Sequence, residues 1–258
     1  MGSRIAQLQA FERLLDIMDE LREKCPWDRK QTFETLRHLT IEETYELGDA
    51  ILDNDLEEVK KELGDLLLHI VFYAKLGSEK KAFDIADVAN EIADKLIHRH
   101  PHIYGETEVE DAEQVVKNWE AIKLKEGKKS VLEGVPKTLP ALVKAYRIQD
   151  KVSGVGFDWD KTEAVLDKLK EELDELSTEI ESGDSYQMEA EFGDVMFSLI
   201  NYARFLKINP ENALERTNKK FIKRFSYIEE KADESQRKVS ELSIEEMEVL
   251  WQEAKKTE

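Results

Sequence analysis

Residues 43–65 read ETYELGDAILDNDLEEVKKELGD, and this stretch decides the fold. Acids stand three apart near each of its ends, first Glu43 and Glu46 and then Glu62 and Asp65. Side chains three residues apart on a helix share one face and lie about one turn from each other. Residues 53–55 read Asp-Asn-Asp, which is typical of a turn with capping side chains. The stretch therefore predicts two consecutive helices whose facing sides bring four carboxylates together.

The same pattern occurs a second time in the chain. Residues 172–194 read ELDELSTEIESGDSYQMEAEFGD, so Glu43, Glu46, Glu62 and Asp65 recur as Glu172, Glu175, Glu191 and Asp194, all displaced by 129 residues. At slightly different offsets, Trp27 pairs with Trp159, Lys95 and Arg99 with Lys220 and Arg224, and Trp119 and Lys123 with Trp251 and Lys255. We therefore predict a tandem duplication, in which each repeat is one helical unit that packs on its twin or on a partner chain.

Apolar residues at intervals of three and four predict the other helices of the first half. The expected helices span residues 5–22, about 32–51, about 55–76 and 84 to about 100. Gly77-Ser78 is expected to end the third helix as a C-terminal cap, and Pro101 to end the fourth. Because Pro101 interrupts them and the second repeat lacks them, His98, His100 and His102 are assigned to a helix end or turn and not to a metal site.

A change of composition separates the two halves. Glycine and proline punctuate residues 127–140, where helical periodicity is weak. The predicted organisation is a first domain at 1–126, a linker at 127–140 and a second domain at 141–258. Since the chain has only five prolines and eleven glycines, the expected fold is all-α, with two tandem units of the four-helix type.

Charge and cysteine content exclude several classes of protein. The chain carries 57 Asp and Glu against 38 Lys and Arg, a formal net charge of −19. So negative a surface repels the phosphates of DNA and RNA and of anionic lipids, so neither a nucleic acid nor a membrane is expected as partner. A single cysteine, Cys25, excludes an internal disulfide, and no apolar run approaches the roughly 20 residues that span a bilayer. Without a signal-peptide pattern, a cytoplasmic protein is expected.

The repeated acids predict a metal site. Several carboxylates on facing helices cannot all stay ionised without a counter-charge, and an all-oxygen set favours Mg²⁺ or Mn²⁺ over Zn²⁺. The alternative is a solvated helix face held by Lys pairs, but repetition of two ordered pairs at a constant offset argues against it. A di-iron carboxylate bundle would need Glu-x-x-His, which both motifs lack.

Cations and tryptophans form a second repeated set. Four-residue spacing puts Lys95 with Arg99, and Lys220 with Arg224, on one helix face, where they can bind phosphate. Trp119 and Trp251 offer aromatic faces for a base, each with a lysine four residues later. Surface salt bridges and core tryptophans are the alternative interpretations. The chain has no P-loop and no convincing Ser-His-Asp or Cys-His arrangement.

These motifs together resemble a known family. The residues that carry the resemblance are Cys25-Pro26-Trp27-Asp28 with Gln31-Thr32, Glu42-Glu43-x-x-Glu46, Glu62-Leu63-Gly64-Asp65, Arg99-His100-Pro101-His102-Ile103-Tyr104-Gly105, Gly134-Val135-Pro136 with Leu139-Pro140-Ala141-Leu142, and Val155-Gly156-Phe157-Asp158-Trp159. The chain resembles the two-domain MazG nucleoside triphosphate pyrophosphohydrolases over essentially its whole length. The resemblance implies an all-α, usually dimeric protein that converts a nucleoside triphosphate and water to the monophosphate and pyrophosphate with Mg²⁺.

The resemblance also implies roles for single residues. Metal ligands fall on Glu172, Glu175, Glu191 and Asp194, with Glu43, Glu46, Glu62 and Asp65 as their counterparts in the first repeat. Nucleotide contacts fall on Lys168, Glu171, Lys220, Arg224 and Trp251, and we extend them to Lys255 and to Lys95, Arg99 and Trp119. Catalytic roles are expected for Glu171, which would activate the attacking water, and for Glu172, with Glu42 and Glu43 as their counterparts. Stacking of a base on Trp251 predicts broad nucleotide specificity, because every base has a π-face.

The two repeats are not expected to be equivalent. Residues 187–190 read Gln-Met-Glu-Ala, so the second repeat lacks a basic residue that the family often carries before its Glu-x-x-Asp, whereas the first has Lys60 and Lys61 nearby. We nevertheless predict that the second repeat is the main site, because it has Lys168 where the first has Leu39. Two alternatives stay open: a related enzyme restricted to one nucleotide, such as dUTP or phosphoribosyl-ATP, and a nucleotide-sensing module without turnover.

Overall fold

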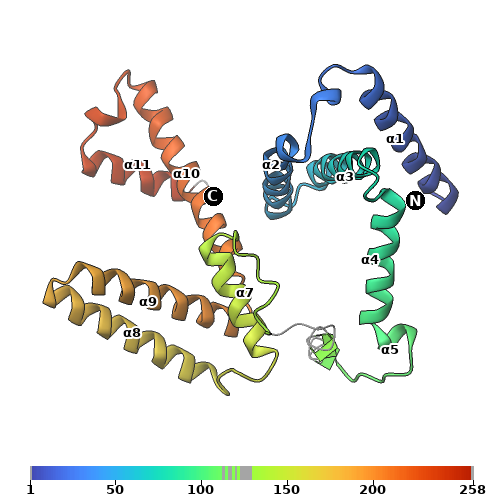
Figure 1. Cartoon of the computed structure of the whole chain (residues 1–258). Helices are drawn as coiled ribbons and strands as arrows, with labels where there is room; N and C mark the ends of the chain where they lie inside the picture. The colour runs from blue at the N-terminus through green and yellow to red at the C-terminus, as the bar shows by residue number, and fades with distance from the viewer. Residues whose placement is uncertain (1, 112–113, 116–117, 120, 123–129, 257–258) are drawn as a thin grey trace. The chain divides into compact units, whose positions relative to one another are not determined.

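The computed structural model describes residues 2–111, 114–115, 118–119, 121–122 and 130–256. Within these ranges all regular secondary structure is α-helix or short 3-10 helix, and no strand occurs. The predicted all-α fold is therefore confirmed. The chain forms two compact units, Met1–Val109 and Glu110–Glu258, which are described separately (Figure 1). No described helix is both long and apolar enough to cross a membrane.

The first unit is a set of helices joined by short turns. Its elements are α1 (Arg4–Lys24), the 3-10 turn η1 (Asp28–Lys30), α2 (Phe33–Leu52), α3 (Leu56–Glu79), α4 (Ile85–Arg99) and α5 (Pro101–Tyr104). Side-chain caps start the helices where the sequence pattern places them: Thr32 accepts from the Thr35 amide, and Asp55 accepts from the Glu57 and Glu58 amides. Asp55 thus starts α3 three residues after α2 ends, which produces the predicted hairpin.

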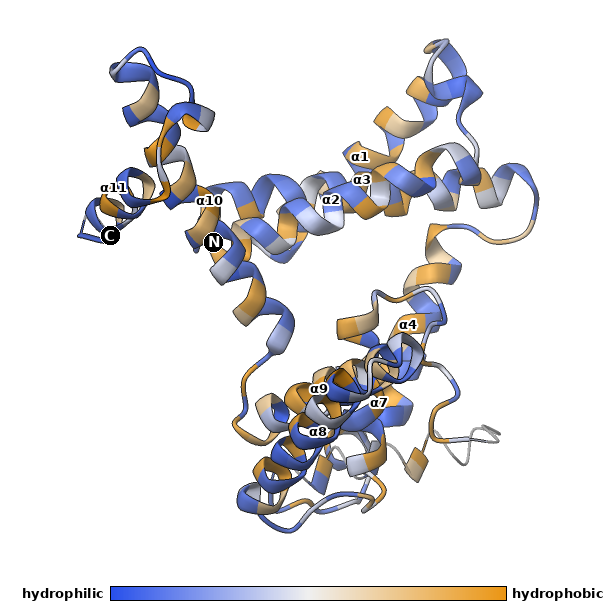
Figure 2. Cartoon of the chain, turned by 90° about the vertical axis from the view of Figure 1, so that its left-hand side faces the viewer, coloured by the Kyte–Doolittle hydropathy of each residue, from blue (hydrophilic) through white to orange (hydrophobic). Residues whose placement is uncertain are grey.

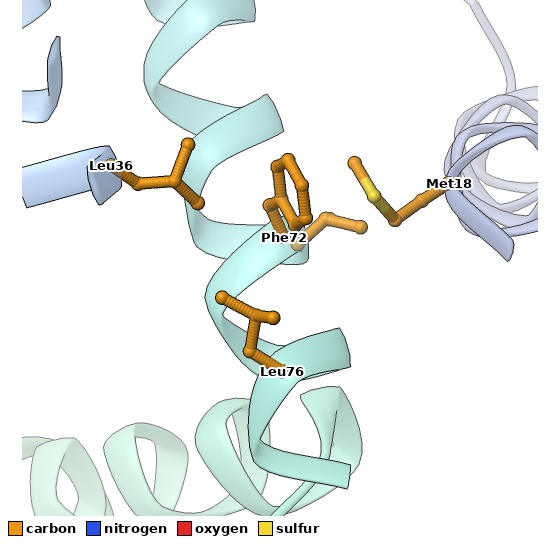
Figure 3. Close-up of a cluster of buried hydrophobic side chains, with 5 residues drawn as sticks. Met18, Leu36, Phe72 and Leu76 are labelled. Atoms are coloured by element: carbon orange, nitrogen blue, oxygen red, sulfur yellow. The ribbon is translucent and has the colours of Figure 1, made fainter. Parts of the chain in front are cut away.

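Three helices contribute to the core of the first unit. Met18 of α1, Leu36 of α2 and the α3 residues Val71, Phe72 and Leu76 are buried together. Figure 3 shows Phe72 and Leu76 on one helix, with Met18 and Leu36 reaching them from two others. Beside this core the hydroxyls of Thr40 and Tyr73 lie 2.8 Å apart. These contacts fix α2 against α3 and so fix the spacing of the acids that both helices carry.

The expected end of α3 at Gly77-Ser78 is wrong. The helix continues to Glu79, and the amide of its C-cap residue Lys80 donates to the Leu76 and Ser78 carbonyls. Gly77 is buried inside the helix, where an added Cβ would lie 2.7 Å from the Phe83 ring. This glycine is therefore required by packing against Phe83 and not by a left-handed cap. The predicted end of α4 before Pro101 is confirmed, with His100 as its C-cap.

The second unit contains four helices in the same succession as α1 to α4, but its 3-10 turn follows the fourth of them and not the first. Its elements are α7 (Ala141–Ser153), α8 (Thr162–Ser182), α9 (Ser185–Phe205), α10 (Pro210–Glu234), the 3-10 turn η2 (Val239–Glu241) and α11 (Ile244–Lys256). Gly183 has a φ of 77°, and Asp184 caps α9, so α8 and α9 form a tight hairpin. Apolar and hydrophilic residues alternate along α8 and α9, as expected of amphipathic helices (Figure 2). α9 packs on α8 and α7, whereas α10 packs mainly on α11 and α7.

Candidate active site

The first acid cluster lies on the α2–α3 hairpin. Carboxylate oxygens of Glu43 and Glu46 from α2 and of Glu62 from α3 lie within 4.8 Å of one another. A cavity of about 250 Å³ adjoins them and is lined by further acids of the turn, among them Asp49, Asp53, Asp55 and Glu58. Asp65 is exposed one turn further along α3 and is not among the three gathered groups.

Glu62 is the most constrained member of this cluster. It is only 5% exposed, and its Oε2 has no hydrogen-bond partner among the described residues. Burial, the charge of Glu46, a hydrogen bond with Glu58 and the charge of Glu43 raise the pKa of Glu62 to about 7. A buried carboxylate oxygen without a partner, beside two further carboxylates, fits a hard divalent cation such as Mg²⁺ or Mn²⁺.

The second acid cluster lies on the α8–α9 hairpin. Oxygens of Glu172 and Glu175 from α8 and of Glu191 from α9 again lie within 4.8 Å of one another. Glu172 is 7% exposed, and burial together with the charge of Glu172 raises the pKa of Glu175. Asp194, like Asp65, is exposed and outside the gathered three. The donor set is all oxygen and fits the same class of cation.

Lys168 distinguishes the second cluster from the first. Its Nζ lies 2.9 Å from Glu171 Oε1 and 3.0 Å from Glu172 Oε1. Hydrogen bonds to these two carboxylates raise the pKa of Lys168 well above its usual range. In the first repeat the corresponding position is Leu39, which packs against the Met18 and Phe72 core. Glu42, the counterpart of Glu171, is exposed.

The predicted cations and Trp251 of the second repeat lie on the α10–α11 pair. The Arg224 guanidinium lies 5.4 Å from the centre of the Trp251 ring. Lys220 is exposed on the same helix as Arg224, and Lys255 is exposed one turn beyond Trp251 on α11. The structure therefore gathers Arg224 and Trp251 on one helix pair and the carboxylates on another, α8–α9.

Sequence reasoning missed one aromatic neighbour of this group. The Phe221 ring centre lies 5.1 Å from that of Trp251, with the ring planes tilted by 56°. Phe221 is 57% exposed, so its ring is accessible beside that of Trp251. The signal in the sequence was its position directly after Lys220, where the first repeat has Leu96 after Lys95.

The corresponding residues of the first repeat are less completely described. Lys95 and Arg99 lie on α4, which ends at Arg99, whereas α10 continues ten residues beyond Arg224 to Glu234. Trp119 is half-buried, and its predicted companion Lys123 lies outside the described residues. The histidine rings of His100 and His102 lie 5.5 Å apart at the junction of α4 and α5, a helix end as predicted.

Comparison with known proteins agrees with this architecture. A family model described as the MazG nucleotide pyrophosphohydrolase domain matches residues 31–104 and 160–228. The nucleoside triphosphate pyrophosphohydrolase of Escherichia coli (strain K12) is 40% identical over 260 residues, which cover 97% of this chain and 99% of that protein. The nucleoside triphosphate pyrophosphohydrolase/pyrophosphatase MazG of Thermotoga maritima is 44% identical over 250 residues, 95% of each chain.

Among solved structures, a mazG-related protein from Thermotoga maritima is 30% identical and covers 44% of this chain and 98% of its own, with a TM-score of 0.40. The two segments matched by the family model contain the two helical hairpins and their acid clusters. With these matched segments and the similarity over nearly the whole length of two relatives, the chain belongs to the MazG nucleotide pyrophosphohydrolase family.

Proposed function

We propose that this protein hydrolyses nucleoside triphosphates to the monophosphate and pyrophosphate, using Mg²⁺ or alternatively Mn²⁺. The observation that carries the proposal is the pair of acid clusters, each of three carboxylates within 4.8 Å on a helical hairpin. Relatives of nearly the same length that are named nucleoside triphosphate pyrophosphohydrolases support it. A divalent cation held there would neutralise phosphate charge in the transition state.

The second repeat is proposed as the main site. Glu172, Glu175 and Glu191 would hold the cation, and Asp194, one turn along α9, would reach it after a change of side-chain rotamer. Water supplies the oxygen of the new P–O bond, the anhydride bond between the α- and β-phosphorus breaks, and we assign the proton leaving the water to Glu171. Lys168, Lys220 and Arg224 would bind phosphate oxygens. Trp251, beside Phe221, would stack on the base, which supports broad base specificity.

We further propose that two copies of the chain associate. On α3, Leu63, Leu67 and Ile70 are 52%, 38% and 48% exposed and follow one another at helical spacing. The corresponding face of α9 exposes Phe192 and Leu199. A helical hairpin with an uncovered apolar face is completed by packing on a second one, and a homodimer would supply it. Light scattering of the full chain at micromolar concentration would give the mass of two chains.

The domain limits 1–126 and 141–258, with a linker at 127–140, are also part of the proposal. Both segments matched by the family model fall inside these limits. Residues 112–113, 116–117, 120 and 123–129 lie outside the described part of the chain, so part of the proposed linker does too. Action in the reduced cytoplasm is supported by the single cysteine, Cys25.

The test is release of pyrophosphate and monophosphate from each canonical ribo- and deoxyribonucleoside triphosphate with Mg²⁺. We expect turnover of all of them, at rates that differ by less than about a hundredfold, since stacking discriminates weakly between bases. Turnover of one nucleotide alone would favour the nucleotide-specific alternative. Nucleotide binding without pyrophosphate release would favour the sensing module and contradict the enzyme proposal.

A further inference from the structure

The two acid clusters differ in the cation nearest to them. In the second cluster the ammonium of Lys168 lies 3.0 Å from Glu172, a proposed ligand that is 7% exposed. At the same position of the first cluster, Leu39 has no charge and packs on the core. The clusters are therefore alike in their carboxylates and unlike in what offsets their charge.

The other lysines of the two hairpins are engaged elsewhere. In the first repeat Lys60 pairs with Glu57 and Lys61 with Glu58. In the second repeat Lys170 pairs with Asp167 at 2.9 Å, and both of those side chains are well exposed. Within the described residues, Lys168 is the cation that forms an ion pair with a member of either three-carboxylate group.

An ammonium in this position opposes a second cation. It occupies one lone-pair direction of Glu172 Oε1 and so places a positive charge 3.0 Å from one oxygen of the carboxylate that a divalent ion would bind. The ion must displace the ammonium or bind against its repulsion. An exposed pair at this spacing would be worth little, but the burial of Glu172 reduces the screening by water.

We propose that Lys168 is an exchangeable counter-ion that competes with the divalent cation for Glu172, so that the second site binds this cation more weakly than the first. The proposal rests on the proposed function, because it assigns the cation to these carboxylates. A triphosphate in the second site would offer the ammonium another anion to bind, and the opposition between lysine and metal would then be relieved. Metal and nucleotide would consequently favour each other's binding in the second repeat.

The test is a titration of the full-length protein with Mn²⁺ without nucleotide, in which free Mn²⁺ is measured by electron paramagnetic resonance. We expect two classes of site, which differ in affinity by about tenfold, a common size for a coupling between sites. Glu62→Gln should remove the tighter class and Glu191→Gln the weaker one. Because Gln matches Glu in size, circular dichroism of both variants should match that of the unchanged protein.

Substitution of the lysine tests the competition itself. Lys168→Leu introduces the residue of the first repeat and should tighten the weaker class by about tenfold. Lys168→Arg, which keeps the charge, should retain weak binding. Lys170→Leu on the same helix is the matched control and should leave both classes unchanged.

The outcomes separate this inference from the proposed function. If Glu62→Gln and Glu191→Gln both leave Mn²⁺ binding unchanged, the carboxylates are not the metal sites and both proposals fail. If they remove the two classes but Lys168→Leu leaves the weaker class as it was, only the counter-ion role of Lys168 is overturned. Equal tightening by Lys168→Leu and Lys170→Leu would also overturn it, since net charge alone would then explain the effect.

Discussion

The α2–α3 and α8–α9 hairpins keep the same acids at the same spacing but differ in the residues around them. Leu36 and Val71 of the first hairpin correspond to Val165 and Ile200 of the second, and all four are buried. Two of the positions at which the hairpins differ bear on the site and on the core. Leu39 becomes Lys168, and Phe72 becomes Asn201, whose Oδ1 accepts from Arg204 Nε at 3.0 Å.

This comparison shows what the two repeats share and where they differ. The first hairpin uses both variable positions for apolar packing, and its unit has the cluster of buried apolar side chains drawn in Figure 3. The second hairpin places polar groups there, and one of them reaches a proposed metal ligand. The acid clusters alone therefore do not distinguish the two repeats, whereas the neighbouring positions do.

The largest expected effect is on activity, when a proposed metal ligand is substituted in one repeat or the other. Glu172→Gln should lower pyrophosphate release by about a hundredfold or more, because it removes one ligand charge beside Lys168. Glu43→Gln should cost less than about threefold if the first repeat is not the main site. Both rates are measured with Mg²⁺ and one nucleotide at saturation. Asp174→Asn, on the same helix as Glu172 but exposed, is the control and should have no effect.

Equal losses in Glu43→Gln and Glu172→Gln would contradict our ranking of the repeats. A large loss in the first variant alone would reverse the ranking. In either case Lys168, which stands where the first repeat has Leu39, would no longer be a reason to place the main site in the second repeat.

The second prediction concerns the ends of the third helices. α3 runs to Glu79, whereas α9 ends at Phe205, which corresponds to position 76 of the first repeat. At the next position the first repeat has Gly77 and the second has Leu206. Gly77→Leu should destabilise the first unit by about 2 kcal/mol, because the new side chain must displace the Phe83 ring.

Hydrogen exchange of α3 amides would measure this loss without unfolding the second unit. Gly48→Ala is the control, since nothing lies within 4 Å of a Cβ at that exposed helical position. It should be neutral or should stabilise α2 by up to about 1 kcal/mol through helix propensity. If Gly77→Leu proves as mild as Gly48→Ala, the contact with Phe83 does not explain the glycine.

Most of the fold could be predicted because its signals are local. The predicted helix at 5–22 corresponds to α1 at Arg4–Lys24, and the turn at 53–55 lies between α2 and α3. Capping side chains and apolar spacing act over a few residues, so a single sequence contains them. The error at Gly77 arose because the reason for that glycine, Phe83, acts through tertiary packing.

The candidate site could be predicted in part for the same reason. Spacing on two facing helices indicated that the acids would gather, and three of four gather in each repeat. The ion pair of Lys168 with Glu172 was within reach of sequence reasoning, since the two residues stand four apart on one helix. Phe221 beside Trp251 was missed despite its position directly after Lys220, because an aromatic residue on a helix usually indicates core packing.

The smallest expected effect concerns an ion pair between an arginine and a carboxylate, here called the arginine clamp. Each unit has one, but between different elements. In the first unit Arg22 of α1 donates to Glu79 of α3, with Nη2 2.7 Å from Oε2. In the second, Arg204 of α9 donates to Asp158 after α7, with Nη2 2.6 Å from Oδ1. The arginine is thus on the first helix of one unit and on the third helix of the other.

These clamps make stability depend on pH. The hydrogen bond from Arg22 holds the pKa of Glu79 below its ordinary value of 4.5, although burial opposes this shift. Because the folded pKa is the lower one, the clamp stabilises the fold fully above about pH 4.5, and this stabilisation is lost as the pH falls through the folded pKa. For Asp158, burial acts to raise the pKa, but hydrogen bonds from Arg204 and Ser153 outweigh it and lower the pKa.

Glu79→Gln should therefore cost the first unit about 0.5–1 kcal/mol at pH 7, a modest value because the Glu79 side chain is 38% exposed. The difference from the unchanged protein should shrink as the pH falls below about 4.5, where the carboxylate is progressively protonated in both states. Hydrogen exchange of α1 and α3 amides, corrected for intrinsic rates at each pH, would measure it. Substitution of Arg22 is less suitable, since its guanidinium also donates to the Asp28 carbonyl and lies 5.6 Å from the centre of the Phe72 ring. If the loss of stability in Glu79→Gln stays constant between pH 7 and pH 3.5, packing of the side chain and not its charge holds α1 to α3.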